Sequence, residues 1–238
     1  MRIPLRHPLD VSVAEARALQ EELRREVREE PALDPSQVKT VAGTDISYLR
    51  ESRLALGAVV LMGYPGMEVL EVRTSALRVP FPYVPGLLSF RELPALLPAL
   101  ESLERTPDLI FADGQGLAHP RFFGLASHLG VLTGIPAIGC AKSRLVGEAA
   151  EPGPEVGDWE PLVYEGRTVG AVLRTRRAVK PLYVSVGHLV DLPTSLRLVL
   201  DCLRGYRLPE PQRKAHAAAD ALKREARAGR IPGAPSPS

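Results

Sequence analysis

The sequence predicts one mixed α/β domain, and the order of its elements is the main reason. Three β-like runs come first, and short strands then alternate with helices. Hairpins pair strands antiparallel and strand-helix-strand units pair them parallel, so we expect a sheet with both kinds of pair. The chain has 238 residues, 45% of them hydrophobic, and no change of composition marks a second domain. We therefore expect a single domain over residues 1–230 and a flexible tail over residues 231–238, which are rich in Pro, Gly and Ser.

The first part of the chain is predicted to form one helix and a three-stranded meander. Apolar residues at helical spacing, such as Ala16 and Leu23, predict an exposed helix over residues 12–30 that flanks the domain and takes no part in a site. Three antiparallel strands follow. They are expected over residues 38–48, 54–62 and 67–79, with a tight turn at Gly63-Tyr64-Pro65-Gly66 between the last two.

The middle of the chain alternates helices with short buried strands. A Pro-rich loop over residues 80–86 leads into a helix over 89–104. A strand over 108–112, a helix over 122–133 and a strand over 136–141 follow.

The last part predicts a hairpin, one more strand and two closing helices. The hairpin covers residues 162–175 and turns at Glu165-Gly166, and the strand covers residues 182–186. The helices are expected over residues 194–203 and from Pro211 onward. This order of elements is that of a ribonuclease H-like fold, in which, by analogy, the first and fourth strands lie side by side at the centre of the sheet.

Two aspartates lie on those two strands. Asp45 interrupts an apolar strand, where a carboxylate facing the core is costly unless it is paired or binds a metal. Asp113 closes the fourth strand at its carboxyl end, where ligands collect in α/β sheets. Each has a structural alternative, which is a solvated strand end for Asp45 and a turn before Gly114 for Asp113.

Three further polar residues are weaker candidates when each is taken alone. Ser89 and Glu92 match the pattern of a capping box, and by themselves they favour that structural role for Glu92. His216 lies in the last predicted helix, where an exposed position is the ordinary expectation. Lys142 follows a strand at the same rim, where a cation can hold a phosphate, although a lone surface lysine is usually only solvated.

As a set, three carboxylates and a histidine without a cysteine are the oxygen-rich ligands that Mg²⁺ or Mn²⁺ prefers. Such a set suits phosphodiester hydrolysis, because a bound ion lowers the pKa of a water molecule and neutralises charge on the leaving oxygen. No P-loop, dinucleotide-binding or Ser/His/Asp signature competes with this interpretation.

The Pro-rich loop and the segment after Asp113 are candidates for contact with nucleic acid. An exposed aromatic residue held between prolines can wedge into a base stack, and packing on the core is the structural alternative. His119 and Arg121 can contact phosphate or start the following helix. The wedge candidates are Pro82, Tyr83, Val84 and Pro85.

Charge, cysteine count and hydropathy limit the functional class. The net charge of +2 is compatible with a polyanionic partner but is weak evidence for one. Cys140 and Cys202 lie far apart in the sequence, so neither a disulfide scaffold nor a zinc site is expected. No run of about 20 apolar residues predicts a membrane span, and we expect a cytoplasmic protein.

Five ordered blocks of sequence resemble those of a known family. Residues 83–92, Tyr-Val-Pro-Gly-Leu-Leu-Ser-Phe-Arg-Glu, are similar to a wedge and glutamate motif, and residues 113–130 are similar to a second acidic motif. The other blocks lie at residues 43–45, 139–143 and 205–211. Together they make the chain similar to the endonuclease V family over about residues 38–220.

The resemblance implies a DNA repair nuclease that acts beside deoxyinosine, the nucleoside that carries the deaminated base hypoxanthine. Asp45, Glu92 and Asp113 would hold Mg²⁺, for which Mn²⁺ would substitute, and His216 would assist the water or a second ion. Lys142 would contact the phosphate. The cut would fall at the second phosphodiester bond 3′ to the lesion and leave 3′-hydroxyl and 5′-phosphate ends. We expect a monomer.

The resemblance also assigns a base pocket. The Pro82–Pro85 loop would separate the strands, and the flipped base would leave the stack at a cost that is lower for a mispair than for a sound pair. The pocket would be drawn from Gly86, Leu88, Gly114, Gly124 and Leu145.

Two alternatives to this function stay open. The same fold can act on inosine in RNA, and a comparison of matched DNA and RNA strands discriminates the two. A catalytically inactive binding module is the other alternative, but such a module should lack at least one carboxylate, and all three are present.

Overall fold

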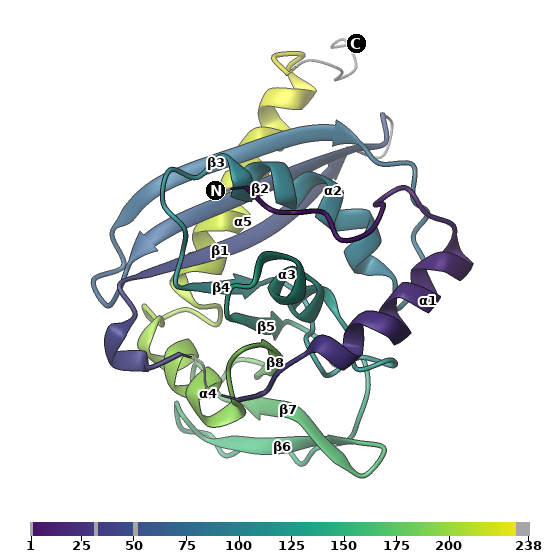
Figure 1. The fold of residues 1–238 in the computed structure, drawn as a ribbon. Helices are drawn as coiled ribbons and strands as arrows, with labels where there is room; N and C mark the ends of the chain where they lie inside the picture. Colours follow the sequence, from purple (N-terminus) through teal and green to yellow (C-terminus); the bar gives the residue numbers. More distant parts are fainter. Residues whose placement is uncertain (1, 31–32, 50–51, 232–238) are drawn as a thin grey trace.

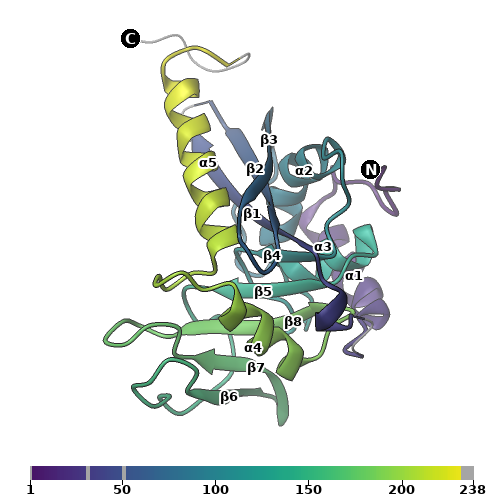
Figure 2. The ribbon, with the colours of Figure 1, turned by 90° about the vertical axis from the view of Figure 1, so that its left-hand side faces the viewer.

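A computed structural model describes residues 2–30, 33–49 and 52–231. Within these ranges the chain forms one mixed sheet of eight strands with helices on both faces (Figure 1, Figure 2). The strands are β1 Thr40–Leu49, β2 Leu54–Gly63, β3 Val69–Arg78, β4 Leu109–Ala112, β5 Ala137–Ala141, β6 Trp159–Tyr164, β7 Arg167–Leu173 and β8 Leu182–His188. Their order across the sheet is β3-β2-β1-β4-β5-β8-β7-β6.

The helices divide between the two faces of this sheet. They are α1 Val13–Leu23, α2 Leu88–Glu101, α3 Leu125–Thr133, α4 Leu192–Asp201 and α5 Glu210–Arg227. Figure 2 shows the sheet from the side, with α4 and α5 covering one face and α1, α2 and α3 covering the other. Short 3₁₀ turns are present at Arg24–Glu26 and Pro35–Gln37.

The predicted meander and the predicted pairing of the first and fourth strands are confirmed. β1, β2 and β3 form an antiparallel meander, and β1 pairs with β4 in parallel at the centre of the sheet. The hairpin between β6 and β7 turns at Glu165 and Gly166, whose positive φ values of 50° and 74° suit a tight two-residue turn.

Alternating side chains of β4 build a core on each face of the sheet. Phe111 packs in a cluster with Val184 and Val199, on the face covered by α4 and α5. Ile110 packs with Leu93 and Leu129, which come from α2 and α3 on the other face. Because both faces are buried, the strand consists of four apolar residues, and the polar Asp113 follows directly at its end.

The N-terminal helix is shorter than the predicted range of residues 12–30. It ends at Leu23, a 3₁₀ turn follows, and Val27 has an extended backbone. Two tertiary hydrogen bonds explain the difference. The Arg28 N–H donates to His188 Nδ1 at 3.2 Å, and the Leu189 N–H donates to the Arg28 carbonyl at 2.7 Å, so this segment is bound to the end of β8 and cannot continue the helix.

The predicted capping box at Ser89 and Glu92 is wrong. Helix α2 begins at Leu88, and no side chain caps it. Ser89 is fully inside the molecule, and its hydroxyl group bonds His128 Nδ1 at 3.0 Å. The partner supplied by α3 therefore outweighs the local pattern, and Glu92 is left without the capping role.

Other helix bounds differ by a few residues. Helix α2 ends at Glu101 instead of residue 104, and α3 starts at Leu125 instead of residue 122, because Phe122 has a φ of 52° that no helix accommodates. In the part of the chain that the structure describes, no helix is both long and apolar enough to cross a membrane. Of the predicted tail, residues 232–238 lie outside the described ranges, and both the tail and the single domain stay predictions.

Candidate active site

The parallel pairing of β1 with β4 brings two predicted ligands together. The last residues paired in parallel are Thr44 and Ala112, so Asp45 and Asp113 come next on neighbouring strands. Asp45 is only 8% exposed. Glu92 lies in the second turn of α2, on the face of the sheet where that helix packs. The register of the sheet therefore places two carboxylates, and α2 supplies the third.

The charges of neighbouring carboxylates raise the pKa values of Asp45 and Glu92. Burial, and then the charge of Asp113, raise the pKa of Asp45 to about 6. Burial, followed by the charges of Asp113 and Asp45, raises the pKa of Glu92 well above its ordinary value. Three mutually repelling acids in a partly buried place destabilise the ionised protein unless a cation joins them.

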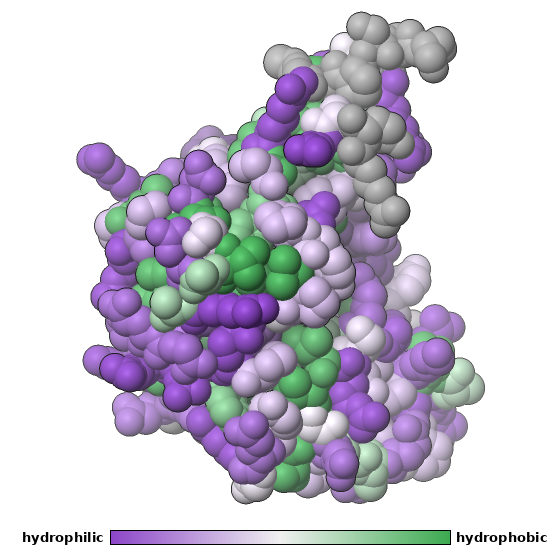
Figure 3. All heavy atoms as spheres, turned by 90° about the vertical axis from the view of Figure 1, so that its right-hand side faces the viewer, coloured by the Kyte–Doolittle hydropathy of each residue, from purple (hydrophilic) through white to green (hydrophobic). Residues whose placement is uncertain are grey.

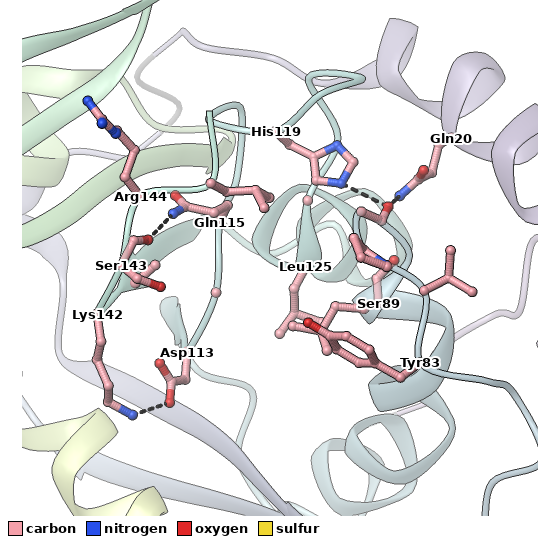
Figure 4. A pocket seen from close by; sticks show the side chains of 18 residues that line it. Gln20, Tyr83, Ser89, Asp113, Gln115, His119, Leu125, Lys142, Ser143 and Arg144 are labelled. Atoms are coloured by element: carbon pink, nitrogen blue, oxygen red, sulfur yellow. Dashed lines mark hydrogen bonds and ion pairs between the residues drawn. The ribbon is translucent and has the colours of Figure 1, made fainter. Parts of the chain in front are cut away.

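Two cationic or polar side chains contact the aspartates directly. Lys142 Nζ lies 2.6 Å from Asp113 Oδ2, at the end of β5 (Figure 4). His216 Nδ1 lies 2.7 Å from Asp45 Oδ2, and its Nε2 is 3.5 Å from Asp220 Oδ2. Lys142 and His216, which were weak candidates from the sequence alone, therefore belong to the same cluster as Asp45 and Asp113.

Close packing of α5 on β1 brings His216 to this place. A Cβ atom on Gly43 would lie 2.1 Å from the carbonyl carbon and oxygen of Pro211, so only glycine allows the first turn of α5 to approach the strand. Gln212 then donates to the Cys140 carbonyl at 3.0 Å and joins the helix to β5. The sequence by itself assigns Gly43 only to a motif, because no pattern of neighbouring residues indicates that this glycine packs against α5.

The donor set fits a hard divalent cation. Among the side chains that the structure describes, no three of the His, Cys, Asp and Glu residues are already grouped closely enough to hold an ion. The carboxylates are nonetheless neighbours that raise each other's pKa, and oxygen donors are those that Mg²⁺ and Mn²⁺ prefer. Asp45, Glu92 and Asp113 are thus the residues that would hold such an ion, with Lys142 and His216 now occupying two of their oxygens.

A cavity of about 360 Å³ opens beside Asp113, and we call it the base cavity. Figure 4 shows Asp113 and Lys142 on one side of it and Tyr83 and His119 on the other. All five residues predicted for a base pocket line it, namely Gly86, Leu88, Gly114, Gly124 and Leu145. Leu125 and Gln115, which the sequence did not single out, line it as well.

The Pro-rich loop forms one wall of the base cavity. Tyr83 is 69% exposed, so it does not pack on the core, whereas Phe81 is buried. Val84 and Pro85 line the base cavity, and Pro82 lines a neighbouring one together with Tyr83. An exposed aromatic residue at a cavity mouth is the arrangement that a wedge requires, and the wedge role stays a prediction.

Three donors converge on the carbonyl oxygen at the end of this loop. Gln20 Nε2, His119 Nε2 and an Arg121 guanidinium nitrogen lie 3.0, 2.9 and 2.7 Å from the Gly86 oxygen. Gly86 has a φ of +77°, which turns its carbonyl toward them. We call these three residues the loop anchor. Their side chains hold the protein itself, and the predicted DNA contacts of His119 and Arg121 stay predictions.

The state of His119 suits this anchoring role. Burial lowers the pKa of His119 to about 4, so the imidazole is neutral at pH 7. Its Nδ1 accepts the Arg121 backbone N–H at 3.1 Å, which leaves Nε2–H to donate to Gly86. The third donor, Gln20, comes from α1, and the expectation that this helix takes no part in a site is wrong because Gln20 also lines the base cavity.

A family model described as Endonuclease V matches residues 21–217. The chain belongs to the endonuclease V family. A curated relative, Endonuclease V of Roseiflexus sp. (strain RS-1), is 53% identical over 226 residues, which cover 94% of this chain and 96% of the relative. The resemblance noted in the sequence is therefore confirmed at the level of the family, and the chain is a nuclease.

Solved structures of endonuclease V proteins have the same fold. The crystal structure from Streptomyces avermitilis aligns with a TM-score of 0.88 at 44% identity, covering 95% of this chain and 99% of that one. Ciona intestinalis Endonuclease V, in complex with a 24mer DNA containing an inosine followed by a ribo-adenosine, aligns with a TM-score of 0.77 at 29% identity, covering 89% and 98%. The predicted ribonuclease H-like fold class is confirmed.

Proposed function

We propose that this chain is a Mg²⁺-dependent DNA repair endonuclease that recognises deoxyinosine and cuts the second phosphodiester bond 3′ to it. The products carry 3′-hydroxyl and 5′-phosphate ends, and Mn²⁺ substitutes for Mg²⁺. Membership of the endonuclease V family supports this function, as does the inosine-containing DNA bound by the Ciona intestinalis protein. The observation that carries the proposal is the base cavity, which is large enough for a flipped base and opens beside Asp113.

The carboxylates and their partners have distinct roles in this reaction. Asp45, Glu92 and Asp113 would hold the ion, which when bound would lower the pKa of a water molecule and neutralise charge on the leaving 3′ oxygen. Lys142, at 2.6 Å from Asp113, is close enough to contact the scissile phosphate. His216 holds the Asp45 carboxylate through Nδ1 and so orients it.

The base cavity and the loop act on the lesion before the bond is cut. Tyr83 fills the gap in the stack that the flipped base leaves, because its exposed ring can stack on neighbouring bases. The loop anchor holds the Gly86 carbonyl in place at the cavity wall. A preformed cavity favours a mispaired inosine, which costs less to flip than a paired base.

The test is cleavage of a labelled duplex carrying one deoxyinosine, with Mg²⁺ or with EDTA, and with products resolved at single-nucleotide length. We expect a Mg²⁺-dependent nick at the second bond 3′ to the lesion and an uncut control duplex with deoxyadenosine at that position. An intact inosine strand in Mg²⁺ contradicts the proposal. Cleavage that persists in EDTA contradicts the metal role alone.

Inosine in RNA is the second candidate substrate. The Ciona intestinalis complex contains a ribonucleotide directly after the inosine, which shows that this related protein accommodates a 2′-hydroxyl group there. Matched DNA and RNA strands with one inosine, cut under single-turnover conditions, compare the two substrates. A faster cut in RNA would make RNA the preferred substrate.

A further inference from the structure

The segment that carries Lys142 lies just beyond the end of a strand. Ala141 is the last residue of β5 and pairs with Tyr183 of β8, so Lys142 and Ser143 follow the strand without belonging to it. The side chain of Lys142 is 41% exposed, and the four-carbon stem of a lysine is flexible. The place of its ammonium group therefore depends on how the main chain of this segment is fixed.

Glutamine side chains hold the main chain on both sides of Lys142. Gln212 Nε2 in α5 donates to the Cys140 carbonyl at 3.0 Å. Gln115, which follows β4, donates from Nε2 to the Ser143 carbonyl at 3.0 Å (Figure 4). The residues before and after Lys142 are thus tied to two segments that are distant in sequence.

Arg207 bonds Lys142 itself and joins the end of β5 to the start of β8. Its Nη2 donates to the Lys142 carbonyl at 2.6 Å and to the carbonyl of Pro181, one residue before β8, at 2.7 Å. The Arg207 carbonyl accepts the hydroxyl hydrogen of the buried Thr175 at 2.7 Å, which fixes the loop that presents this arginine. Hydrogen bonds from a charged donor are stronger than neutral ones, so Arg207 is the strongest of the three donors to this segment.

A second arginine of the same loop makes bonds of the same kind away from the site. Arg204 donates to the carbonyls of Asp201, Leu203 and Pro65 at 3.0, 2.7 and 2.6 Å, and none of these residues belongs to the proposed site. Hydropathy does not distinguish one surface arginine from another, because hydrophilic side chains are common there. On the face that lies to the right in Figure 1, for example, they surround a group of hydrophobic ones (Figure 3). The hydrogen-bond partners do distinguish Arg204 from Arg207.

From these contacts we propose that Arg207 is a positioning residue, which fixes the main chain of Lys142 so that the lysine ammonium group lies at the scissile phosphate. In the structure this ammonium group is 2.6 Å from Asp113 Oδ2. Arg207 acts through Lys142 and does not contact the phosphate. The inference rests on the proposed function, because that function assigns Lys142 to the phosphate. It also gives a task to the sequence block at residues 205–211, which the proposed function leaves without one.

The experiment is a double-mutant cycle on the full-length protein. Arg207→Ala and Arg204→Ala are each made in the wild type and in Lys142→Ala. The single-turnover rate of cutting a labelled duplex with one deoxyinosine is measured in Mg²⁺ at saturating protein, together with the protein concentration that gives half of this rate. Arg204→Ala is the matched control, because it removes the same side chain and the same kind of bond from the same loop. Melting temperatures report whether each variant is folded.

We expect Arg207→Ala to lower the single-turnover rate by about 30-fold, because a displacement of about 1 Å in a reacting group can cost about 100-fold. The half-saturating concentration should change by less than about twofold, because only a contact made at the reacting phosphate is lost. In Lys142→Ala, the further loss on Arg207→Ala should be below about twofold, since the group that Arg207 positions is absent. Arg204→Ala should leave the rate unchanged in both backgrounds.

Arg207→Lys extends the test and replaces Arg207→Ala if that variant does not fold. The ammonium group keeps a charged donor but lacks the planar guanidinium, so we expect a rate between those of the wild type and Arg207→Ala. This smaller loss should also disappear in Lys142→Ala.

Two results overturn the inference and leave the proposed function standing. One is a loss on Arg207→Ala by the same factor in both backgrounds, which would mean that Arg207 acts on the reaction or on the fold independently of Lys142. The other is an Arg207→Ala variant that cuts as fast as the wild type. If the wild type does not cut the deoxyinosine strand in Mg²⁺, the proposed function is wrong, and the inference is wrong with it.

Discussion

The carboxylate cluster and the loop anchor lie beside the same cavity but are held in different ways. Asp45 and Asp113 owe their positions to the main-chain register of β1 and β4, which pair in the middle of the sheet. The Gly86 carbonyl owes its position to side chains that are distant in sequence, of which Gln20 is 66 residues away. The first arrangement is built by backbone pairing and the second by individual side-chain hydrogen bonds.

Because of this difference, substitutions in the carboxylate cluster and in the loop anchor should affect catalysis and lesion recognition in different ways. Backbone pairing in a central strand is stable and tolerates changes of side chain, so a substitution in the cluster should remove its chemistry and leave the fold. A carbonyl held by three side chains loses only one of several bonds when one donor is removed, so substitutions there should act gradually. The predictions below test this contrast, from the largest expected effect to the smallest.

The largest effect is expected from Asp45→Ala or Asp113→Ala. Loss of one ligand removes several kcal/mol of transition-state stabilisation, so the single-turnover cleavage rate should fall by at least about 10³-fold. Binding of an inosine-containing duplex, measured by fluorescence anisotropy, should change by less than about threefold. Asp10→Ala, at an exposed aspartate that does not line the base cavity, is the control. Cleavage that survives in either ligand variant would remove the metal assignment.

The second effect is a pH-dependent loss of stability in the metal-free protein. The pKa of Asp45 is raised from 3.8 to about 6, so the folded state binds more protons than the unfolded state between these values. Stability from this group is complete below about pH 4 and is lost as the pH rises through 6, by on the order of 3 kcal/mol. Urea unfolding in EDTA across this range measures it.

Asp45→Asn should abolish most of that pH dependence, because the amide carries no charge at any pH in the window. The variant should accordingly be more stable than the wild type at pH 7 in EDTA. Addition of Mg²⁺ should raise the melting temperature of the wild type and have a smaller effect on the variant. A wild type and an Asp45→Asn variant whose stabilities change in parallel between pH 4 and 6 in EDTA would show that Asp45 is not destabilised as we describe.

The third effect concerns the wedge. Tyr83→Ala removes the exposed ring and should lower the cleavage rate of an inosine-containing duplex by about tenfold, since stacking on one base contributes about 1–3 kcal/mol. On a single strand, where no stack has to be opened, the loss should be less than about twofold. Tyr83→Phe keeps the ring and should restore most of the duplex rate. Equal losses of Tyr83→Ala on both substrates would argue against a wedge.

The smallest effect is expected at the loop anchor. Gln20→Ala removes one of the three donors to the Gly86 carbonyl and should cost about 1 kcal/mol, or about fivefold in kcat/KM on the duplex. Glu22→Ala, an exposed position on the same helix, serves as the matched control. A loss as large as that of Asp113→Ala would show that the loop anchor takes part in catalysis, as the carboxylate cluster does.

The elements that local patterns could reveal were largely predicted. The meander, the buried strands and the hairpin at Glu165 and Gly166 follow from alternating hydrophobicity and turn residues, and all are present. Asp45 and Asp113 were found because a charge in or after a buried strand is a local anomaly. Their meeting was also predictable, since the strand order implied that β1 and β4 are neighbours.

Errors occurred where a distant residue outweighed a local preference. The segment after Leu23 leaves the helix to bond the end of β8, and Ser89 bonds His128 instead of capping α2. A capping box was predicted at the wrong place, although one does form at Ser12 and Glu15, where no distant partner competes. Local patterns decide the local structure only at positions where no residue distant in the sequence makes a competing contact.

By itself, the sequence determined the α/β class, the order of the elements along the chain, the carboxylates and the family of this protein, because hydrophobic periodicity and long motifs are properties of neighbouring residues. Only the tertiary structure decided that α1 contributes Gln20 to the site, that Gly43 admits α5 and His216 to the strand bearing Asp45, and that a cavity opens beside Asp113. These features depend on contacts between segments far apart in the chain, and no local pattern encodes such contacts.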